Sequence, residues 1–258
     1  MKRILTICMI FLAAMAVEAQ TVAVVDFMKV PANGGANYVA IEKQWKTLHQ
    51  NRVDAGEIVA WELYYVRNTG TSSPYNFATV TVYENFSKTA NWATDAEMKK
   101  AFGEKMDDFL KKTDASRNLA YSETFFLQVG IPSDVPDKYI VVNEVQADNV
   151  DNYINMEKVG YMPIHQEAKK LGQRNSWGIW TRWPNNDNSY QAVAVDGYTK
   201  FEDINGGDYG KALDNVVSGK KSGEIFDMMN QLNKTDQVRK IVKTEIWDLV
   251  DITTPKKK

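Results

Sequence analysis

Apolar positions recur along the chain with two different periods, and these periods predict an order of strands and helices. Residues 22–28 and 139–145 are rich in β-branched side chains, as is typical of strands. Residues 38–55 carry apolar and aromatic side chains at helical spacing, and Gly56 is the type of residue at which a helix commonly ends. A helix over residues 150–171 contains Pro163, so we expect it to kink or restart there.

The remaining segments complete the same order of elements in each half of the chain. Residues 59–67 and 177–183 are predicted to be second strands, each followed by a stretch rich in turn-forming residues. Thr94 and Glu97 have the spacing of a capping box, which predicts the start of a helix with one apolar face. The equivalent helix after Phe201 is less regular. Each half is therefore predicted to run strand, helix, strand, strand, helix, strand.

An internal repeat explains why the two halves share this order. One group of positions in the first half recurs in the second at a constant offset, and three further pairs of segments recur in the same chain order. Such self-similarity indicates two homologous units. We predict repeat 1 over residues 20–131, a linker over 132–137, repeat 2 over 138–252 and a disordered tail over 253–258. The constant-offset positions are Trp45, Leu48, His49, Gly56 and Trp61, which correspond to Tyr161, Ile164, His165, Gly172 and Trp177.

The first 19 residues have the pattern of a secretory signal peptide. Lys2 and Arg3 precede an apolar run over residues 4–16, and small residues stand at positions 17 and 19. The run is too short to cross about 30 Å of hydrocarbon with margin. We therefore predict cleavage before Gln20 and export to the periplasm or the medium. The single cysteine, Cys8, would leave with this segment, which excludes disulfides, cysteine nucleophiles and thiolate metal sites from the mature chain.

Composition excludes further classes of protein. With 44% hydrophobic residues the chain can bury enough apolar surface to fold. The 31 Lys and Arg against 33 Asp and Glu give a formal charge of −2, so no nucleic-acid partner is expected. No other apolar run is long enough to span a bilayer, so no membrane partner is expected after cleavage. The chain has only two histidines and no recognisable metal-binding, phosphate-binding or serine-hydrolase motif.

The pattern within the strands predicts the fold class. A unit of strand, helix, strand, strand, helix, strand is the ferredoxin-like βαββαβ motif, in which both helices cover one face of the sheet. In the second strand Trp61 and Leu63 alternate with Ala60 and Tyr64, so both faces are apolar and need cover. We therefore predict an α+β protein in which two ferredoxin-like repeats pack sheet to sheet as a pseudo-two-fold α+β barrel.

This pattern resembles the dimeric α+β-barrel superfamily in its fused, tandem form. Tyr161, Ile164 and His165 near the end of a helix, then a glycine and a strand containing Trp177, are similar to the pattern of NIPSNAP-type and EthD-type domains. Relatives with this architecture include cofactor-free monooxygenases, haem-degrading enzymes and chlorite dismutases. The resemblance implies the fold more strongly than any one function, because one fold hosts many chemistries.

The two histidines are the first candidate site residues. His165 and His49 occupy the same repeat position, and a histidine near neutral pH can serve as a general base or haem ligand. The alternative is that both are boundary residues kept from a common ancestor.

Aromatic and basic residues near the second and last strands are the other candidates. A small-molecule pocket needs aromatic walls and a few convergent polar groups. The aromatic residues could instead be core, and each arginine could form a cross-strand ion pair with Glu123 or Glu245. The candidate ligand-binding residues are Trp61, Trp177, Phe125, Trp247, Arg117 and Arg239.

Two functions follow from these candidates. The first is an exported protein that binds a small apolar ligand in a pocket between the sheets, without a cofactor or metal. The alternative is a haem-using or cofactor-free oxidoreductase of the monooxygenase type, with His165 as base or haem ligand. In both cases the expected partner is a small molecule, and the protein is a monomer or a homo-oligomer.

Overall fold

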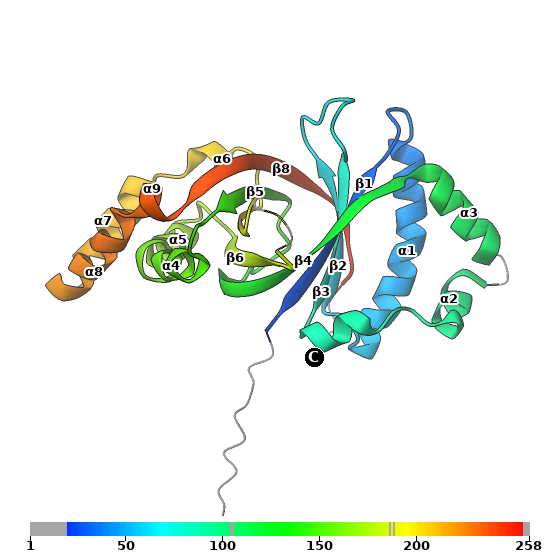
Figure 1. Ribbon diagram of the computed structural model, residues 1–258, viewed down its shortest axis with the longest axis horizontal. Coiled ribbons are helices and arrows are strands. Elements are labelled where there is room, and N and C mark those ends of the chain that lie inside the picture. The colour runs from blue at the N-terminus through cyan, green and yellow to red at the C-terminus, as the bar shows by residue number, and fades with distance from the viewer. Residues whose placement is uncertain (1–19, 104–105, 186, 188, 255–258) are drawn as a thin grey trace, which may run out of the picture.

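The computed structural model describes residues 20–254 except 104–105, 186 and 188. The predicted signal peptide, residues 1–19, and the end of the predicted tail, residues 255–258, lie outside the described residues. In the described part of the chain the strands form one closed barrel in the order β1-β3-β2-β8-β5-β7-β6-β4, with helices outside it (Figure 1). The strands are β1 (Val22–Lys29), β2 (Ala60–Val66), β3 (Phe77–Tyr83), β4 (Asn118–Ile131), β5 (Tyr139–Gln146), β6 (Ser176–Trp183), β7 (Ala192–Tyr198) and β8 (Lys240–Ile252).

The helices lie in two groups on opposite sides of the barrel (Figure 1). The first group covers the strands of the first half, and the second group covers those of the second half. No helix in the ranges that the structure describes is long and apolar enough to cross a membrane. The first group is α1 (Gly35–Ala55), η1 (Phe86–Ala90), α2 (Asp95–Phe102) and α3 (Met106–Ser116). The second is α4 (Val150–Met156), η3 (Glu157–Tyr161), α5 (Met162–Lys170), α6 (Asp203–Gly206), α7 (Tyr209–Ser218), α8 (Ser222–Leu232) and α9 (Thr235–Val238).

The predicted packing of two ferredoxin-like sheets face to face is wrong. The sheets of the two halves instead join edge to edge, through antiparallel pairing of β4 with β6 and of β2 with β8. This is possible because β4 and β8 are long, at 14 and 13 residues, so each pairs with a strand of its own half and then with one of the other half. Closure of the barrel satisfies every strand edge with hydrogen bonds, which two stacked sheets would leave open.

Both faces of the strands are apolar because the closed barrel has an inner and an outer layer. In β2, Trp61 and Leu63 pack outward in a core beneath α1, whereas Tyr64 and Val66 belong to the core inside the barrel. In β7, Ala192 packs outward in the core that contains α4, and Val193 packs inward. The alternation seen in the sequence is thus correct for β2, and one of its two apolar sets faces the barrel interior.

Two β-bulges occupy equivalent positions in the long strands. Between β1 and β4 the register shifts so that Ala120 has no opposite residue, and between β5 and β8 the same happens at Val242. A bulge reverses the side to which the following side chains point. Residues before and after each bulge therefore face opposite sides of the barrel wall, although their spacing in the sequence suggests one side.

Local signals in the sequence agree with the helix boundaries. Gly56 ends α1 in the left-handed conformation, with φ of 75°, and Thr94 and Glu97 form a complete capping box at the start of α2. The predicted interruption near Pro163 is present, since a π-helical turn separates α4 from α5 and the proline lies in the first turn of α5. Thr253, the first residue of the predicted tail, is buried and bonds the backbone of Trp61 through its hydroxyl group.

Candidate functional site

The barrel encloses a cavity of about 690 Å³. Most of its wall is aromatic or aliphatic and comes from the inward side chains of the strands. At one end the wall continues into residues 131–137, which join β4 to β5, and there Val59 and Val135 are 49% and 53% exposed. This end is therefore the one that meets solvent. The aromatic side chains in the wall are Phe27, Tyr64, Phe125, Trp177, Trp180, Tyr190 and Trp247.

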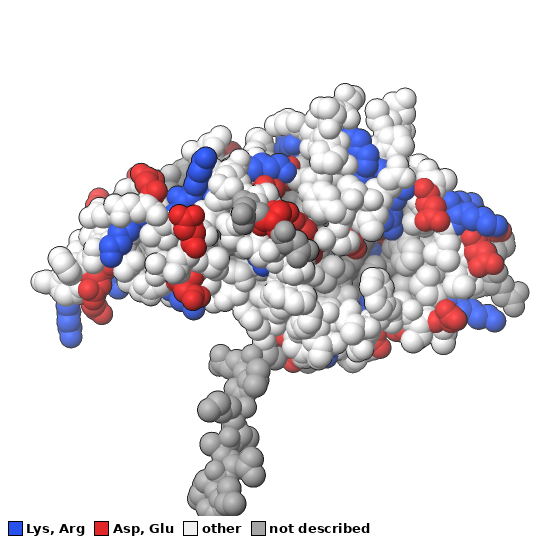
Figure 2. Space-filling view, in the orientation of Figure 1, with Lys and Arg blue, Asp and Glu red and all other residues white. Residues whose placement is uncertain are grey.

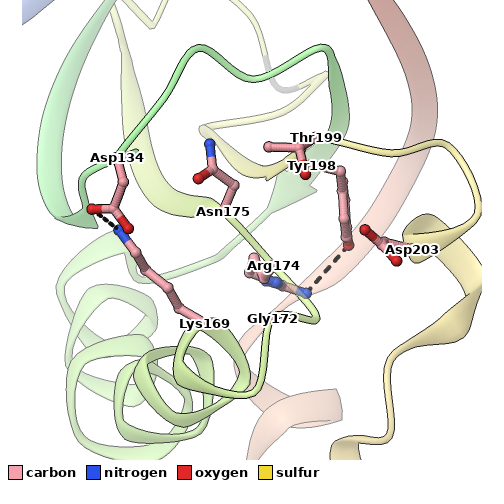
Figure 3. A pocket seen from close by; sticks show the side chains of 8 residues that line it. All are labelled: Asp134, Lys169, Gly172, Arg174, Asn175, Tyr198, Thr199 and Asp203. Carbon is pink, nitrogen blue, oxygen red and sulfur yellow. Dashed lines mark hydrogen bonds and ion pairs between the residues drawn. The ribbon is translucent and has the colours of Figure 1, made fainter.

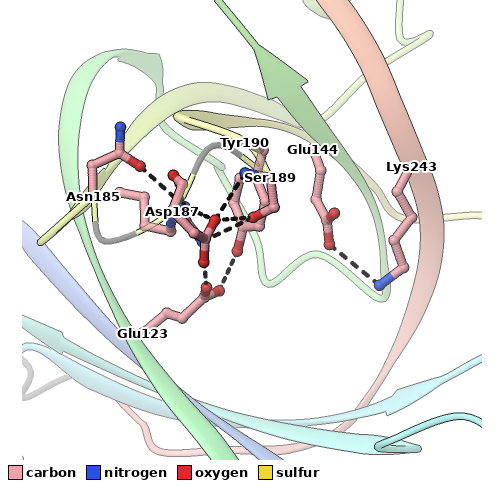
Figure 4. Close-up of polar contacts among 8 residues, drawn as sticks. Glu123, Glu144, Asn185, Asp187, Ser189, Tyr190 and Lys243 are labelled. Atoms are coloured by element: carbon pink, nitrogen blue, oxygen red, sulfur yellow. Dashed lines mark hydrogen bonds and ion pairs between the residues drawn. The ribbon is translucent and has the colours of Figure 1, made fainter.

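Two groups of ion pairs lie at the opposite end of the barrel (Figure 4). The Arg182 guanidinium lies 3.1 Å from a carboxylate oxygen of Glu123 and 2.7 Å from one of Asp187. The same guanidinium stands over the ring of Tyr190, whose hydroxyl group donates to Glu123. All four groups are held by one another, and Tyr190, which lines the cavity, is thereby fixed in place.

A second cluster at this end contains two carboxylates that line the cavity. Lys243 Nζ lies 3.2 Å from Glu144 Oε1 and 3.0 Å from Glu245 Oε1. Glu245 also accepts hydrogen bonds from the hydroxyl of Tyr75 at 2.9 Å and from Trp247 Nε1 at 3.0 Å. Burial raises the pKa of Glu144, and Lys243 opposes that effect. The negative charge at this end is therefore compensated within the protein.

Glu62 is a carboxylate that projects into the cavity from a strand, β2. It lies on β2 beside Tyr64, whose hydroxyl group donates to Glu62 Oε2 at 2.7 Å. Glu62 is half-buried, because its side chain faces the cavity, and it lies deep in the molecule. Loss of contact with water at this depth raises its pKa, and the negative charge of Asp137 raises it too. The hydrogen bond from Tyr64 acts in the opposite direction, because it stabilises the ionised carboxylate.

Asp137 is held in place at the same end of the cavity. Its carboxylate accepts from Ser176 Oγ at 2.6 Å and from Asn175 Nδ2 at 2.7 Å. A Cβ atom at Gly197 would overlap Ser176 and Asp137, so only glycine leaves room for this contact. Residues 132–137, which were predicted as a linker, thus contribute directly to the rim of the cavity.

The structure places the predicted ligand-binding residues in two different layers. Phe125 and Trp247 line the cavity, and Trp177 contributes to its wall while packing outward as well. Trp61 packs beneath α1 and is absent from the cavity wall. The two arginines also lie in the outer layer.

Arg117 and Arg239 pair with glutamates of the covering helices. Arg117 Nε lies 3.2 Å from Glu42 Oε1, and Arg239 bonds Glu157. The cross-strand pairing with Glu123 and Glu245 that the sequence suggested does not occur, because the bulges at Ala120 and Val242 turn those glutamates inward. Burial raises the pKa of both Glu42 and Glu157 to about 7, although the arginines lower it.

His165 is buried between α5 and the outer face of β6. Its ring stacks on Trp177 at 4.5 Å between centroids, and its Nδ1 lies 2.6 Å from Arg174 Nη1. A guanidinium can only donate, so Nδ1 is the acceptor and the ring proton is on Nε2. Burial, followed by the positive charge of Arg174, lowers the pKa of His165 well below 6.5. His165 is therefore neutral, and its Nδ1 already accepts a hydrogen bond from Arg174.

His49 repeats this arrangement in the first half without the arginine. Its ring stacks on Trp61 with centroids 5.1 Å apart and planes 5° apart. Burial lowers its pKa to about 3. Neither histidine lines the barrel cavity or the smaller pocket around Arg174. In each half the imidazole ring packs between a helix and a strand, where burial favours its neutral form.

A smaller pocket of about 210 Å³ lies on the surface around Arg174 (Figure 3). Arg174 contributes to it but also bonds Asp196 and the hydroxyl of Tyr209, so its donors are engaged. Lys169 is paired with Asp134 at 2.9 Å. The pocket is polar, and three of its charged groups, Asp134, Lys169 and Arg174, already have partners. It is lined by Asp134, Lys169, Gly172, Arg174, Asn175, Tyr198, Thr199 and Asp203.

Glu62 and Tyr64 are the site residues that sequence reasoning missed. The available signal was a single acidic residue within an otherwise apolar strand, Ala60–Val66. Such a glutamate is common on a solvated strand face, and only the closed barrel shows that this face is internal.

Neither histidine is expected to titrate between pH 5 and pH 8. Their lowered pKa values keep both rings neutral over this range. Nitrogen-15 NMR of the imidazoles should show constant shifts, with the His165 proton on Nε2. A His165 signal that titrates near the ordinary pKa, about 6.5, would show that the ring is accessible and available as a base.

Comparisons with known proteins identify the fold only. No protein-family model matches the chain, and no curated protein matches it. Among solved structures, a proposed monooxygenase from Lactobacillus acidophilus NCFM is 12% identical and has a TM-score of 0.54, with 92% of this chain and 97% of that chain covered. A proposed monooxygenase from Fusobacterium nucleatum subsp. nucleatum is also 12% identical, with a TM-score of 0.52 and coverage of 92% and 95%. At this level of identity the two likenesses show a shared fold.

Proposed function

We propose that this protein binds a small, mostly apolar molecule inside its barrel. The observation that supports this most directly is the cavity of about 690 Å³, whose wall is largely aromatic and aliphatic. Pockets for small ligands have volumes of roughly 300–1,000 Å³ and combine such walls with a few placed polar groups. Moving apolar surface from water into the cavity stabilises the complex by about 25 cal/mol per Å².

The two ends of the barrel suggest how a ligand is admitted. Ion pairs around Arg182 and Lys243 fix one end, whereas the other is bordered by residues 132–137 and the exposed Val59. The segment 132–137 contains two prolines and no regular secondary structure. A ligand would enter past this segment and lie against the aromatic wall. We place this binding in an exported protein, on the pattern of residues 1–19.

Titration with N-phenyl-1-naphthylamine tests the proposal. This neutral probe becomes fluorescent when it leaves water for an apolar site, and its size suits the cavity. We expect saturable binding of one probe per chain with a dissociation constant in the micromolar range, together with quenching of tryptophan fluorescence. Native mass spectrometry of the purified protein would identify a ligand that copurifies. Fluorescence that rises linearly with probe concentration, without saturation, would contradict a defined site.

A second candidate function is oxygenation of an aromatic molecule in the same cavity. It is favoured by the two solved structures described as proposed monooxygenases, with which this chain shares its fold. Oxygen uptake with a phenolic probe such as 1-naphthol, and its conversion to a quinone that has gained one oxygen atom and lost two hydrogen atoms while the second oxygen atom leaves as water, would support this function. An unchanged rate of oxygen consumption on addition of protein would leave ligand binding as the function.

The histidines do not fit a haem version of this enzyme. His165 Nδ1 is occupied by Arg174, its ring is stacked on Trp177, and neither it nor His49 lines the cavity. A haem iron would therefore find no histidine ligand there, and His165 is equally unable to act as a base on a ligand in the barrel. In a titration with haemin we expect the wild-type protein and His165→Ala to give the same absorption spectrum. A Soret band that is present in the wild type and lost in His165→Ala would contradict this expectation.

A further inference from the structure

Charge is distributed very differently inside and outside the barrel. On the outside, acidic and basic side chains lie interspersed over the visible face (Figure 2). Inside, the described residues that line the cavity include five carboxylates and no lysine, arginine or histidine. The five are Glu62, Asp134, Asp137, Glu144 and Glu245. A cavity with walls of this kind repels anions and favours a positively charged group.

The carboxylates other than Glu62 have partners that stabilise them. Glu144 and Glu245 share Lys243, and Asp134 is paired with Lys169. Asp137 accepts hydrogen bonds from Ser176 and Asn175. These four groups are accounted for by the protein itself, so their presence in the wall does not require a ligand.

Glu62 differs from them. Within the part of the chain that the structure describes, no basic side chain forms an ion pair with Glu62. Its carboxylate accepts a hydrogen bond from Tyr64 at Oε2. The charge that acts on it, that of Asp137, is also negative and raises its pKa further. A carboxylate that is deep, uncompensated and aimed into an apolar cavity destabilises the ligand-free protein. Such a group at a cavity wall is typical of a binding site.

We propose that the ligand of this cavity carries a protonated amine, which binds Glu62. This inference rests on the proposed binding function and specifies the chemical class of ligand. The ammonium group would donate to the carboxylate oxygen that Tyr64 leaves free. The apolar body of the ligand would lie against the aromatic wall that includes Phe125, Trp180 and Trp247.

The surroundings of Glu62 suit an ammonium group in a second way. The rings of Tyr64 and Trp247 have centroids 5.8 Å apart, and both line the cavity. An aromatic face attracts a cation through its quadrupole, and the attraction grows where water is excluded. Tyr64, whose hydroxyl group bonds Glu62, therefore places an aromatic ring beside the carboxylate, and an uncharged head group would lose both the ion pair and this contact.

The test compares three probes that share one apolar body. 1-Naphthylmethylamine, 1-naphthylmethanol and 1-naphthoic acid are cationic, neutral and anionic at pH 7, and each can be assayed by calorimetry and by displacement of N-phenyl-1-naphthylamine. We expect the amine to bind at least about 10-fold more tightly than the alcohol, which corresponds to about 1.4 kcal/mol. The acid should bind most weakly.

Two variants assign the preference to this site. Glu62→Gln keeps the shape of the side chain and should bring the amine to within about twofold of the alcohol. Tyr64→Phe removes only the hydroxyl group and should reduce the preference in part, so it provides a second check if Glu62→Gln folds poorly. Glu84→Gln removes the same charge from an exposed position on the surface and should keep the full preference.

The outcomes separate the two proposals. If the alcohol binds as tightly as the amine, or if Glu62→Gln keeps the preference, the amine inference is wrong while the cavity remains a binding site. If neither the naphthalene probes nor N-phenyl-1-naphthylamine bind, the proposed function itself is wrong. If the amine preference is present, is lost in Glu62→Gln and is kept in Glu84→Gln, both are supported.

Discussion

Replacing Arg239 with methionine is expected to lower the free energy of unfolding by about 3–5 kcal/mol, because it leaves a buried carboxylate without its partner. The partner, Glu157, is 1% exposed. Methionine fills much of the volume of the arginine stem, so the loss reflects charge rather than a cavity. Denaturant unfolding followed by circular dichroism measures the effect.

The pH dependence of this loss gives it a signature. Burial raises the pKa of Glu157 in the folded protein from 4.5 to about 7, so folding takes up a proton between these values. A raised carboxyl pKa means that the contribution of this group to the free energy of unfolding is greatest below pH 4.5 and falls as pH rises towards 7. Without Arg239 the folded pKa rises further, because the arginine lowers it. The loss in Arg239→Met should therefore be larger at pH 8 than at pH 5.

Two further variants separate this explanation from general damage. Arg67→Met removes an arginine from a pair with Asp248 in which both side chains are partly exposed, and it should cost at most about 1 kcal/mol. The double variant Arg239→Met with Glu157→Leu removes both charges and should recover most of the lost stability. A loss in Arg239→Met that is the same at pH 5 and pH 8 would argue against an uncompensated carboxylate as its cause.

Substituting Val195 with phenylalanine should abolish binding of N-phenyl-1-naphthylamine. Val195 lines the cavity from β7, and it lies opposite Val142 of β5, which also lines the cavity. A phenyl ring there occupies space that the probe needs. We expect the affinity to fall by at least about 100-fold, which is about 2.7 kcal/mol. The fluorescence titration of the wild-type protein provides the reference.

The matched control carries the same change on the outside of the barrel. Val250 of β8 is 36% exposed and does not line the cavity, so Val250→Phe should bind the probe as the wild type does. Circular dichroism and thermal unfolding establish that both variants fold. If Val195→Phe folds and still binds with unchanged affinity, the probe binds elsewhere, and the barrel interior is not the site.

The sequence by itself determined features that depend on a few neighbouring residues. The end of α1 at Gly56, the capping box at Thr94 and the interruption before Pro163 follow from backbone geometry and from hydrogen bonds within one turn. The alternation of apolar residues in the strands was equally local. It predicted that both faces of β2 need cover, but not what covers them.

Only the tertiary structure decided which side of the wall each residue faces. The pairing of β2 with β8 joins residues almost two hundred positions apart, and no periodicity records such a partner. The bulges at Ala120 and Val242 add one residue against a distant strand, which places Arg117 and Arg239 outside the barrel and Glu123 and Glu245 inside. Glu62 became a candidate for the same reason, since closure of the barrel turned an ordinary strand face into the wall of a cavity.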